Sequence, residues 1–389
     1  MRIILFFAAF LAAFGLEAQG IKFFSGSWQE ALDKAKAENR YIFVDAYATW
    51  CGPCKKMSSY TFKDEEVGNY FNRNFINVKL NMEDQGDGTA VAEQFSVSSY
   101  PTFLFIGPDG ELAYRSVGYQ EPDDFLDLGK TVIEEAPKMA QYAKKYESGD
   151  RSLDFLYTYA TALQKMEDPK SAEVAEAYLE KQTNWSNPKA IELIVANFAK
   201  IDHPAFEYAH QHSDDFIEEI GEESYNEFVS DAVVEKSIEL YQEEDKLPEK
   251  TCKALYMKYM KKDGEKKFYT FCMNLYEYVE EWENYARSAK TYVEKFSADM
   301  DASTYNNLAW KFYVNVDAKA DLEKALEWVL TSIKLEKGYS NMDTAASLYY
   351  KLGNKGKAKK YAQEAIRLGK AQGEDVSMTE ELLEKINQM

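Results

Sequence analysis

Two cysteines, Cys51 and Cys54, stand three positions apart and enclose Gly52 and Pro53. They follow an apolar run that predicts a buried strand, and they precede a lysine-rich segment that predicts a helix. This placement puts the first cysteine at a helix N-terminus, where unpaired backbone N–H groups and the helix dipole stabilise a thiolate. The spacing therefore predicts a redox pair, in which Cys51 attacks a substrate disulfide and Cys54 resolves the mixed disulfide.

Two other uses of the cysteine pair fit the sequence less well. A zinc site needs two further Cys or His ligands. The remaining cysteines, Cys252 and Cys272, and the histidines, His203, His210 and His212, all lie in a distant part of the chain. We therefore predict no metal and no cofactor. A purely structural disulfide that closes so short a loop would add little stability through chain entropy.

The residues around the pair, from about 21 to 135, alternate between helix and strand patterns. Ser27 and Glu30 form a capping box that opens a helix. The run 41–47 predicts a buried strand, continuously apolar apart from Asp45. Further helix and strand patterns follow, and a Pro-Asp-Gly turn between two apolar runs predicts a closing hairpin. Together these patterns predict an α/β domain with a mixed central sheet flanked by helices.

Four motifs in this order resemble the thioredoxin family. They are Trp-Cys-Gly-Pro-Cys at 50–54, the strand acid Asp45, Asn-Val-Lys-Leu-Asn around Lys79, and Ser-Tyr-Pro-Thr at 99–102. The helical segment after the Cys motif is closer to the periplasmic C-terminal module of DsbD than to the smallest thioredoxins. The resemblance implies a thioredoxin fold with Cys51 and Cys54 as the redox-active disulfide.

The resemblance also implies roles for the residues around the pair. Asp45 would be buried with a raised pKa, and it would take the proton from Cys54 as that thiol attacks. Lys79 would approach and support this acid. The Tyr100–Pro101 bond would be cis, and the backbone of Tyr100 would pair with an extended substrate segment. Substrate contacts are accordingly expected at Trp50, Gly52, Pro53, Tyr100 and Pro101.

After about residue 136 the strand patterns disappear, and helical patterns separated by Pro, Gly or Asp follow one another. The segment around Ala325 recurs around Ala358, an offset of 33 residues, which predicts stacked helix pairs. This repeat resembles the tetratricopeptide family. We expect an α-helical region of degenerate repeats over 137–302 and a tetratricopeptide-like solenoid over 303–389.

Cys252 and Cys272 lie on apolar helix faces on either side of a Lys-Lys-Asp-Gly break, so both should point inward. An antiparallel helical hairpin would bring them to about the same level. The sequence leaves three states open for them: buried free thiols, a second disulfide or a second redox relay.

The composition and the N-terminus bear on location. The chain has 389 residues, 46% of them hydrophobic, and a net charge of −20, which argues against an electrostatic grip on nucleic acid. Residues 1–18 combine Arg2, an apolar stretch over 3–16 and a small residue at Ala18, which predicts a cleavable signal peptide. The thioredoxin-like domain, 19–136, would then be exported to the periplasm; an uncleaved membrane anchor is the alternative.

Together the observations predict an exported thiol–disulfide oxidoreductase that reduces protein disulfides, with the helical region selecting or holding partner proteins. A membrane reductase of the DsbD type would supply its electrons. Two alternatives stay open. One is an interaction scaffold or chaperone with an accessory redox site, and the other is an isomerase or oxidant that runs the same chemistry in another direction.

Overall fold

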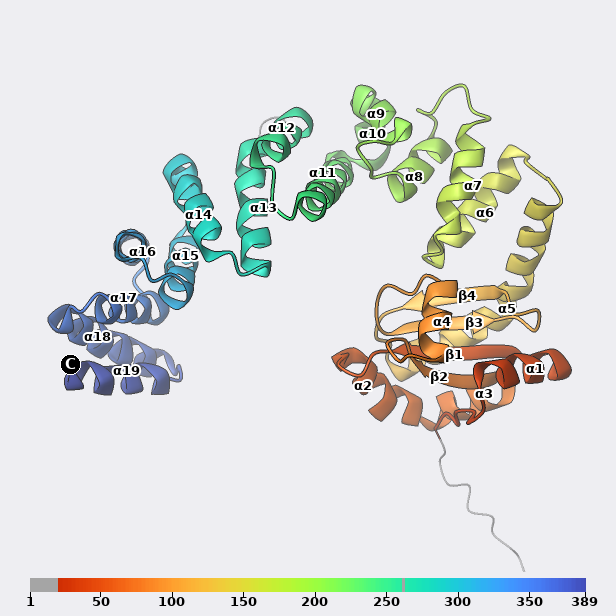
Figure 1. Ribbon diagram of the computed structural model, residues 1–389, viewed down its shortest axis with the longest axis horizontal. Helices are drawn as coiled ribbons and strands as arrows, with labels where there is room; N and C mark the ends of the chain where they lie inside the picture. The colour runs from red at the N-terminus through yellow and green to blue at the C-terminus, as the bar shows by residue number, and fades with distance from the viewer. Residues whose placement is uncertain (1–19, 261–262) are drawn as a thin grey trace, which may run out of the picture. The chain divides into compact units, whose positions relative to one another are not determined.

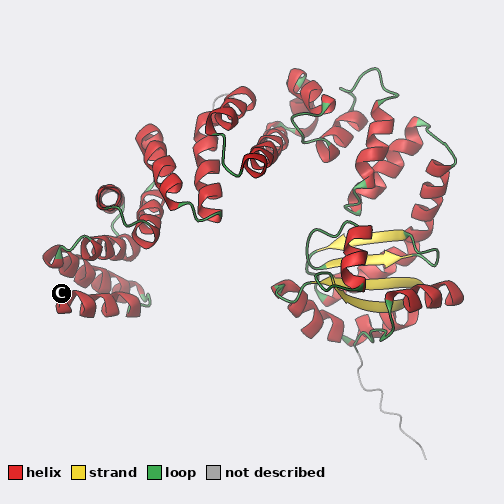
Figure 2. Cartoon of the chain, in the orientation of Figure 1, coloured by secondary structure: helices red, strands yellow, loops and turns green. Residues whose placement is uncertain are grey.

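The computed structural model describes residues 20–260 and 263–389 (Figure 1). The predicted signal peptide, residues 1–18, lies outside the described residues. The chain divides into two compact units, Met1–Glu222 and Glu223–Met389. Every strand in the described residues belongs to the first unit, and the described part of the second unit consists of helices joined by loops and turns (Figure 2).

The first unit begins with an α/β domain built on a four-stranded sheet of order β2-β1-β3-β4. β1 pairs in parallel with β2 and antiparallel with β3, and β3 forms an antiparallel hairpin with β4. The predicted mixed sheet and its closing hairpin are therefore confirmed. The strands are β1 (Tyr41–Tyr47), β2 (Phe75–Asn81), β3 (Thr102–Ile106) and β4 (Leu112–Val117).

Helices cover both faces of the sheet, and further helices follow the α/β domain within the first unit. Those of the α/β domain are α1 (Trp28–Glu38), α2 (Gly52–Ser59), the 3₁₀ turn η1 (Thr61–Lys63), α3 (Glu65–Asn74), α4 (Asp87–Gln94) and α5 (Pro122–Glu147). Five shorter helices follow, α6 (Leu153–Lys165), α7 (Lys170–Leu179), α8 (Pro188–Asn197), α9 (Pro204–Gln211) and α10 (Ser213–Ile220).

Both faces of the sheet are buried, because successive side chains of a strand point to opposite sides. On β1, Ile42, Val44 and Ala46 pack against α1 and α4. Phe43 points to the other face, into a phenylalanine-rich cluster with η1, α3 and α5. A strand buried on both faces reads as one continuous apolar run, which is the pattern seen in the sequence.

Local signals place the first and last helices of the domain. The side chain of Ser27 caps α1 and Glu30 returns the bond, so the predicted capping box is confirmed. α5 runs unbroken through Pro137, and thus crosses the domain boundary that the sequence suggested after residue 136. The domain boundaries themselves stay a prediction.

The second unit consists of helices packed in consecutive pairs. Ala325 of α16 and Ala358 of α18, the small residues of the 33-residue repeat, are both fully buried. The tetratricopeptide assignment stays a prediction. In the described parts of the chain, no helix is both long and apolar enough to cross a bilayer. The helices are α11 (Glu222–Glu244), α12 (Glu249–Tyr259), α13 (Gly264–Tyr278), α14 (Trp282–Phe296), the turn η3 (Ser297–Asp299), α15 (Ala302–Asn315), α16 (Lys319–Leu335), α17 (Tyr339–Lys351), α18 (Lys355–Gln372) and α19 (Ser377–Gln388).

Candidate functional site

The two cysteines of the motif form a disulfide at the start of α2. Cys51 is the N-cap residue, and its sulfur accepts a hydrogen bond from the backbone N–H of Cys54 at 3.1 Å. Pro53 sits in the first turn, where a missing N–H leaves no helical hydrogen bond unmade. After reduction, the same N–H and the helix N-terminus would stabilise a thiolate on Cys51.

An aromatic rim stands beside the disulfide. Trp50 is 67% exposed, so it lines the surface as expected and fills no core. Its ring meets that of Tyr100 edge to face, with the ring centroids 6.0 Å apart. The indole N–H donates to both carboxylate oxygens of Glu83, each at 2.9 Å. Glu83 therefore fixes the indole of Trp50 next to the cysteines.

The loop that carries Tyr100 has the geometry that the resemblance implied. The Tyr100–Pro101 bond is cis, which confirms that prediction. Within the described residues, neither the N–H nor the C=O of Tyr100 takes part in a backbone–backbone hydrogen bond. Burial, and then the Glu83 charge, raise the pKa of the Tyr100 phenol. The loop thus offers an unpaired peptide group beside the disulfide.

A buried ion pair lies in the sheet next to α2. Asp45 is completely buried, and it points to the same face as Phe43, where Met57 of α2 also packs. Lys79, its register partner on β2, donates to Asp45 Oδ2 at 2.6 Å. The other carboxylate oxygen, Oδ1, is buried and has no hydrogen-bond partner among the described residues.

The charge state of Asp45 follows from these contacts. Burial raises the pKa of Asp45 above its usual range, and the Lys79 charge and hydrogen bond lower it by less. A buried carboxyl whose pKa is raised and whose free oxygen lacks a donor is suited to accept a proton. The predicted burial of Asp45 is confirmed, and the direction of its pKa agrees with the prediction. Its role as proton acceptor stays a prediction.

Two residues of this site were missed by the sequence reasoning. Glu83 lies in the loop after β2, and no local pattern links it to Trp50. Ser58 lies on α2, and its Oγ accepts a hydrogen bond from Lys79 Nζ at 2.5 Å. Its spacing of four residues from Cys54, which puts both on one helix face, was the signal available.

The remaining cysteines lie in the second unit. Cys252 on α12 and Cys272 on α13 are both fully buried and both free, so of the three open states the structure has buried free thiols. Burial raises the pKa of each thiol. Inaccessible thiols held in the neutral form are poor nucleophiles. These two cysteines therefore form no second exchange site.

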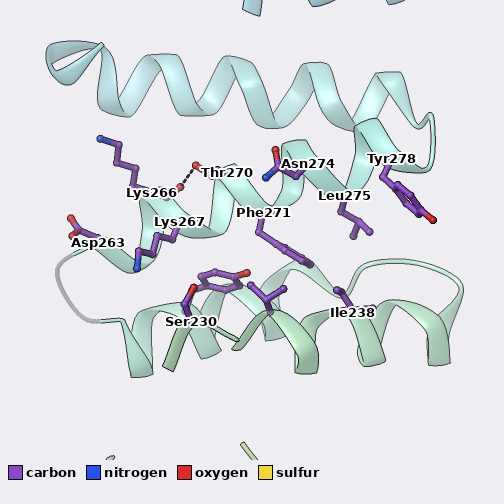
Figure 3. Close-up of a pocket in the computed structure, with 12 residues that line it drawn as sticks. Ser230, Ile238, Asp263, Lys266, Lys267, Thr270, Phe271, Asn274, Leu275 and Tyr278 are labelled. Atoms are coloured by element: carbon purple, nitrogen blue, oxygen red, sulfur yellow. Dashed lines mark hydrogen bonds between the residues drawn. The ribbon is translucent and has the colours of Figure 1, made fainter. Parts of the chain in front are cut away.

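A groove of about 800 Å³ in the second unit is the other candidate for binding. It lies between α11 and α13, and Phe271 and Leu275 contribute to its lining. Figure 3 shows Asp263, Lys266 and Lys267 at one end and Tyr278, which is 87% exposed, at the other. The groove is thus mainly apolar, with Ser230, Thr270 and Asn274 as polar lining residues and with two lysines and one aspartate at one end.

Comparisons with known proteins each match a part of this chain. The family model described as "Thioredoxin-like domain" matches residues 28–133. The thiol:disulfide interchange protein DsbD of Pseudoalteromonas atlantica is 28% identical over 109 residues, which are 27% of this chain and 18% of that protein. Thioredoxin H4 of Arabidopsis thaliana is 35% identical over 96 residues, 25% of this chain and 75% of that protein.

A solved structure is also similar to part of this chain. It is the solution structure of a provisional disulphide-isomerase from Bacteroides thetaiotaomicron, 44% identical, covering 30% of this chain and 97% of that one, with a TM-score of 0.28. The chain spans less than a fifth of the length of the first DsbD relatives that it matches. The family model ends at residue 133, so helices α6 to α19 lie outside it.

Proposed function

Because the chain belongs to the thioredoxin family, we propose that it is a thiol–disulfide oxidoreductase that reduces disulfides in partner proteins. The observation that supports this most directly is the Cys51–Cys54 disulfide at the N-terminus of α2, close to a buried carboxyl with a raised pKa. The chain's own electrons would come from a donor of the DsbD type. We also keep the proposal that it works in the periplasm after removal of residues 1–18.

The chemistry proceeds in two exchange steps. The Cys51 thiolate attacks one sulfur of the substrate disulfide, and the other substrate sulfur leaves as a thiolate. Asp45 then accepts the proton of the Cys54 thiol, and the resulting thiolate attacks the Cys51 sulfur. The Cys51–Cys54 bond forms as the bond from Cys51 to the substrate breaks. The substrate leaves reduced, and the enzyme is left oxidised.

The surface around the disulfide is suited to an extended polypeptide. The free peptide group of Tyr100 can pair with the backbone of a substrate strand, as in strand addition. Trp50, Gly52 and Pro53 would flank that strand on the side of the cysteines. Glu83 holds the indole of Trp50 in place.

The groove of the second unit supports a role in holding the partner. Its occupant would be an apolar segment of the substrate protein that carries a carboxylate at one end. Lys267, which makes no ion pair within the described residues, would receive this carboxylate. Lys266 is already 3.8 Å from Asp299, so it would contribute less. Phe271 and Leu275 would pack against the apolar part.

A trapping experiment tests the function. The Cys54→Ser variant cannot resolve its mixed disulfides, so partner proteins should remain attached to Cys51. Adding Leu275→Asp should reduce their recovery by placing a charge in the groove. Leu335→Asp is the matched control, because Leu335 is 57% exposed on α16, away from the groove. If Cys54→Ser traps nothing while partners still bind, the scaffold alternative is favoured.

The reduction potential separates the directions of electron flow. A potential near −270 mV, as in thioredoxin, is expected for a reductant; values near −180 or −120 mV characterise isomerases and oxidants. Equilibration of the full chain with glutathione buffers measures it. A potential between about −180 and −120 mV would contradict the proposal that the protein is a reductant, but not the proposal that it exchanges disulfides.

A further inference from the structure

Ser58 ties the cysteine-bearing helix to the buried acid. Cys54 and Ser58 are four residues apart on α2, so their side chains share one face of that helix. The Ser58 oxygen lies 2.5 Å from Lys79 Nζ, and the same nitrogen lies 2.6 Å from Asp45 Oδ2. One ammonium group therefore joins α2 to β1, one turn beyond the resolving cysteine.

The other surroundings of Lys79 do not fix the position of its ammonium group. Its side chain is 27% exposed, so water could compete for the ammonium group. The ring of Tyr47 lies 4.6 Å from Lys79 Nζ, and more distant rings come from Phe23 at 5.6 Å and Phe62 at 5.7 Å. Ring faces attract a cation without fixing its direction. The Ser58 oxygen supplies a directed contact on the side of α2.

We propose that Ser58 is a positioning residue for proton transfer during resolution: its hydroxyl oxygen holds the Lys79 ammonium on Asp45 Oδ2 and leaves Oδ1 to take the proton of Cys54. The inference rests on the proposed role of Asp45 as proton acceptor. In the step itself, the proton passes from the Cys54 sulfur to Asp45, and the Cys54 electron pair forms the bond to Cys51. The substrate sulfur leaves Cys51 as a thiolate.

The consequence of removing the hydroxyl has a definite sign. Among the described residues, Lys79 on β2 is the charged group that lowers the pKa of Asp45. Without Ser58, the ammonium group is freer to move toward water, and it lowers the pKa of Asp45 less. The carboxylate is then present only at higher pH, so the acid limb of resolution should move to higher pH.

The experiment uses the reduced full chain and a small disulfide, 5,5′-dithiobis(2-nitrobenzoate), in a stopped-flow instrument. Release of the first thiolate reports attack by Cys51, and release of the second, independent of reagent concentration, reports resolution by Cys54. On the acid limb, Ser58→Ala should slow the second phase about threefold to tenfold, since a pKa shift of one unit changes a population tenfold. Ser58→Thr, which keeps the oxygen, should restore the wild-type profile.

Two controls make the result specific. Ser59→Ala changes the next residue of α2, whose hydroxyl donates, within the described part of the chain, only to the Lys56 carbonyl. It should leave the profile unchanged. In a Lys79→Met background, Ser58→Ala should add no further shift, because its effect passes through the ammonium group. A profile of Ser58→Ala that superimposes on wild type, or a shift that persists without Lys79, would overturn the inference. Failure of the proposed reductase direction would appear in the reduction potential instead.

Discussion

Replacing Asp45 by Asn should make the α/β domain more stable at neutral pH while impairing its chemistry. Asp45 is fully buried, one of its oxygens has no partner among the described residues, and burial outweighs Lys79 in setting its charge. An unsatisfied buried polar group costs about 1–3 kcal/mol, and each unit of raised pKa is worth about 1.4 kcal/mol. We therefore expect Asp45→Asn to raise the free energy of unfolding by about 1–3 kcal/mol at pH 7.

The pH dependence gives this prediction its sign. The folded-state pKa of Asp45 is raised above that of the unfolded chain, so the neutral acid is favoured by folding. Its stabilising contribution is full below the unfolded value of about 3.9, and it is lost as the pH rises through the folded value. Asn cannot titrate. The gap between variant and wild type should thus vanish near pH 3 and open toward neutral pH.

The measurement must isolate one unit, because the chain has two compact units and a global signal would mix their transitions. Samples of the oxidised protein equilibrated in urea at each pH would receive a short deuterium pulse, and peptides from β1 and β3 would report the transition. Asp33→Asn, at an exposed position of α1, is the matched control and should change little. A less stable Asp45→Asn at pH 7, or a gap equal at pH 3 and pH 7, would refute the reasoning.

Two further predictions concern the second unit. The reduced native chain should release two thiolates per molecule from 5,5′-dithiobis(2-nitrobenzoate), and the unfolded chain should release four. The reason is that Cys252 and Cys272 are buried and their pKa values are raised. Rapid release of four thiolates by the native chain would contradict this prediction. Gly264→Ala should destabilise the second unit by about 1–3 kcal/mol, since a Cβ there would lie 2.4 Å from the Tyr256 carbonyl oxygen. At Gly356 an added Cβ would meet no atom within 4 Å, so Gly356→Ala should instead stabilise the unit by about 0.5–1 kcal/mol. Urea unfolding followed by deuterium pulses, read on peptides from α13 and α18, measures both changes in stability. Equal changes at the two glycines would show that the contact with the Tyr256 carbonyl oxygen does not destabilise the Gly264 variant.

The parts of the fold that were predictable from sequence are those determined by patterns of a few neighbouring residues. The capping box at Ser27 and Glu30 begins α1, and the uninterrupted apolar run of β1 marks a strand covered on both faces. Cys51 and Cys54 were identifiable because their function depends on spacing at a helix start. Each of these signals is contained within a few neighbouring residues, so no knowledge of tertiary packing was needed.

The contacts that escaped prediction depend on segments distant in sequence. Ser58 meets Lys79 across 21 positions, and Glu83 meets Trp50 across 33. Serine and glutamate are common on exposed surfaces, so their types gave no warning. The groove between α11 and α13 was equally hidden, because its lining resembles ordinary packing between helices until the helices are placed.

Asp45 is a carboxyl in an otherwise apolar core, and the free-energy cost of burying it bears on why this residue is there. The face of the sheet to which it points is otherwise apolar and rich in phenylalanine. The ring centroids of Phe43, Phe71 and Phe125 lie 4.5–5.5 Å apart. An apolar side chain would suit this core better than a carboxyl with an unpartnered oxygen. The hydrogen bond from Lys79, which Ser58 also contacts, lowers the cost of burying Oδ2. Oδ1 has no hydrogen-bond partner among the described residues. The retained penalty supports the proposed role of Asp45 in proton transfer.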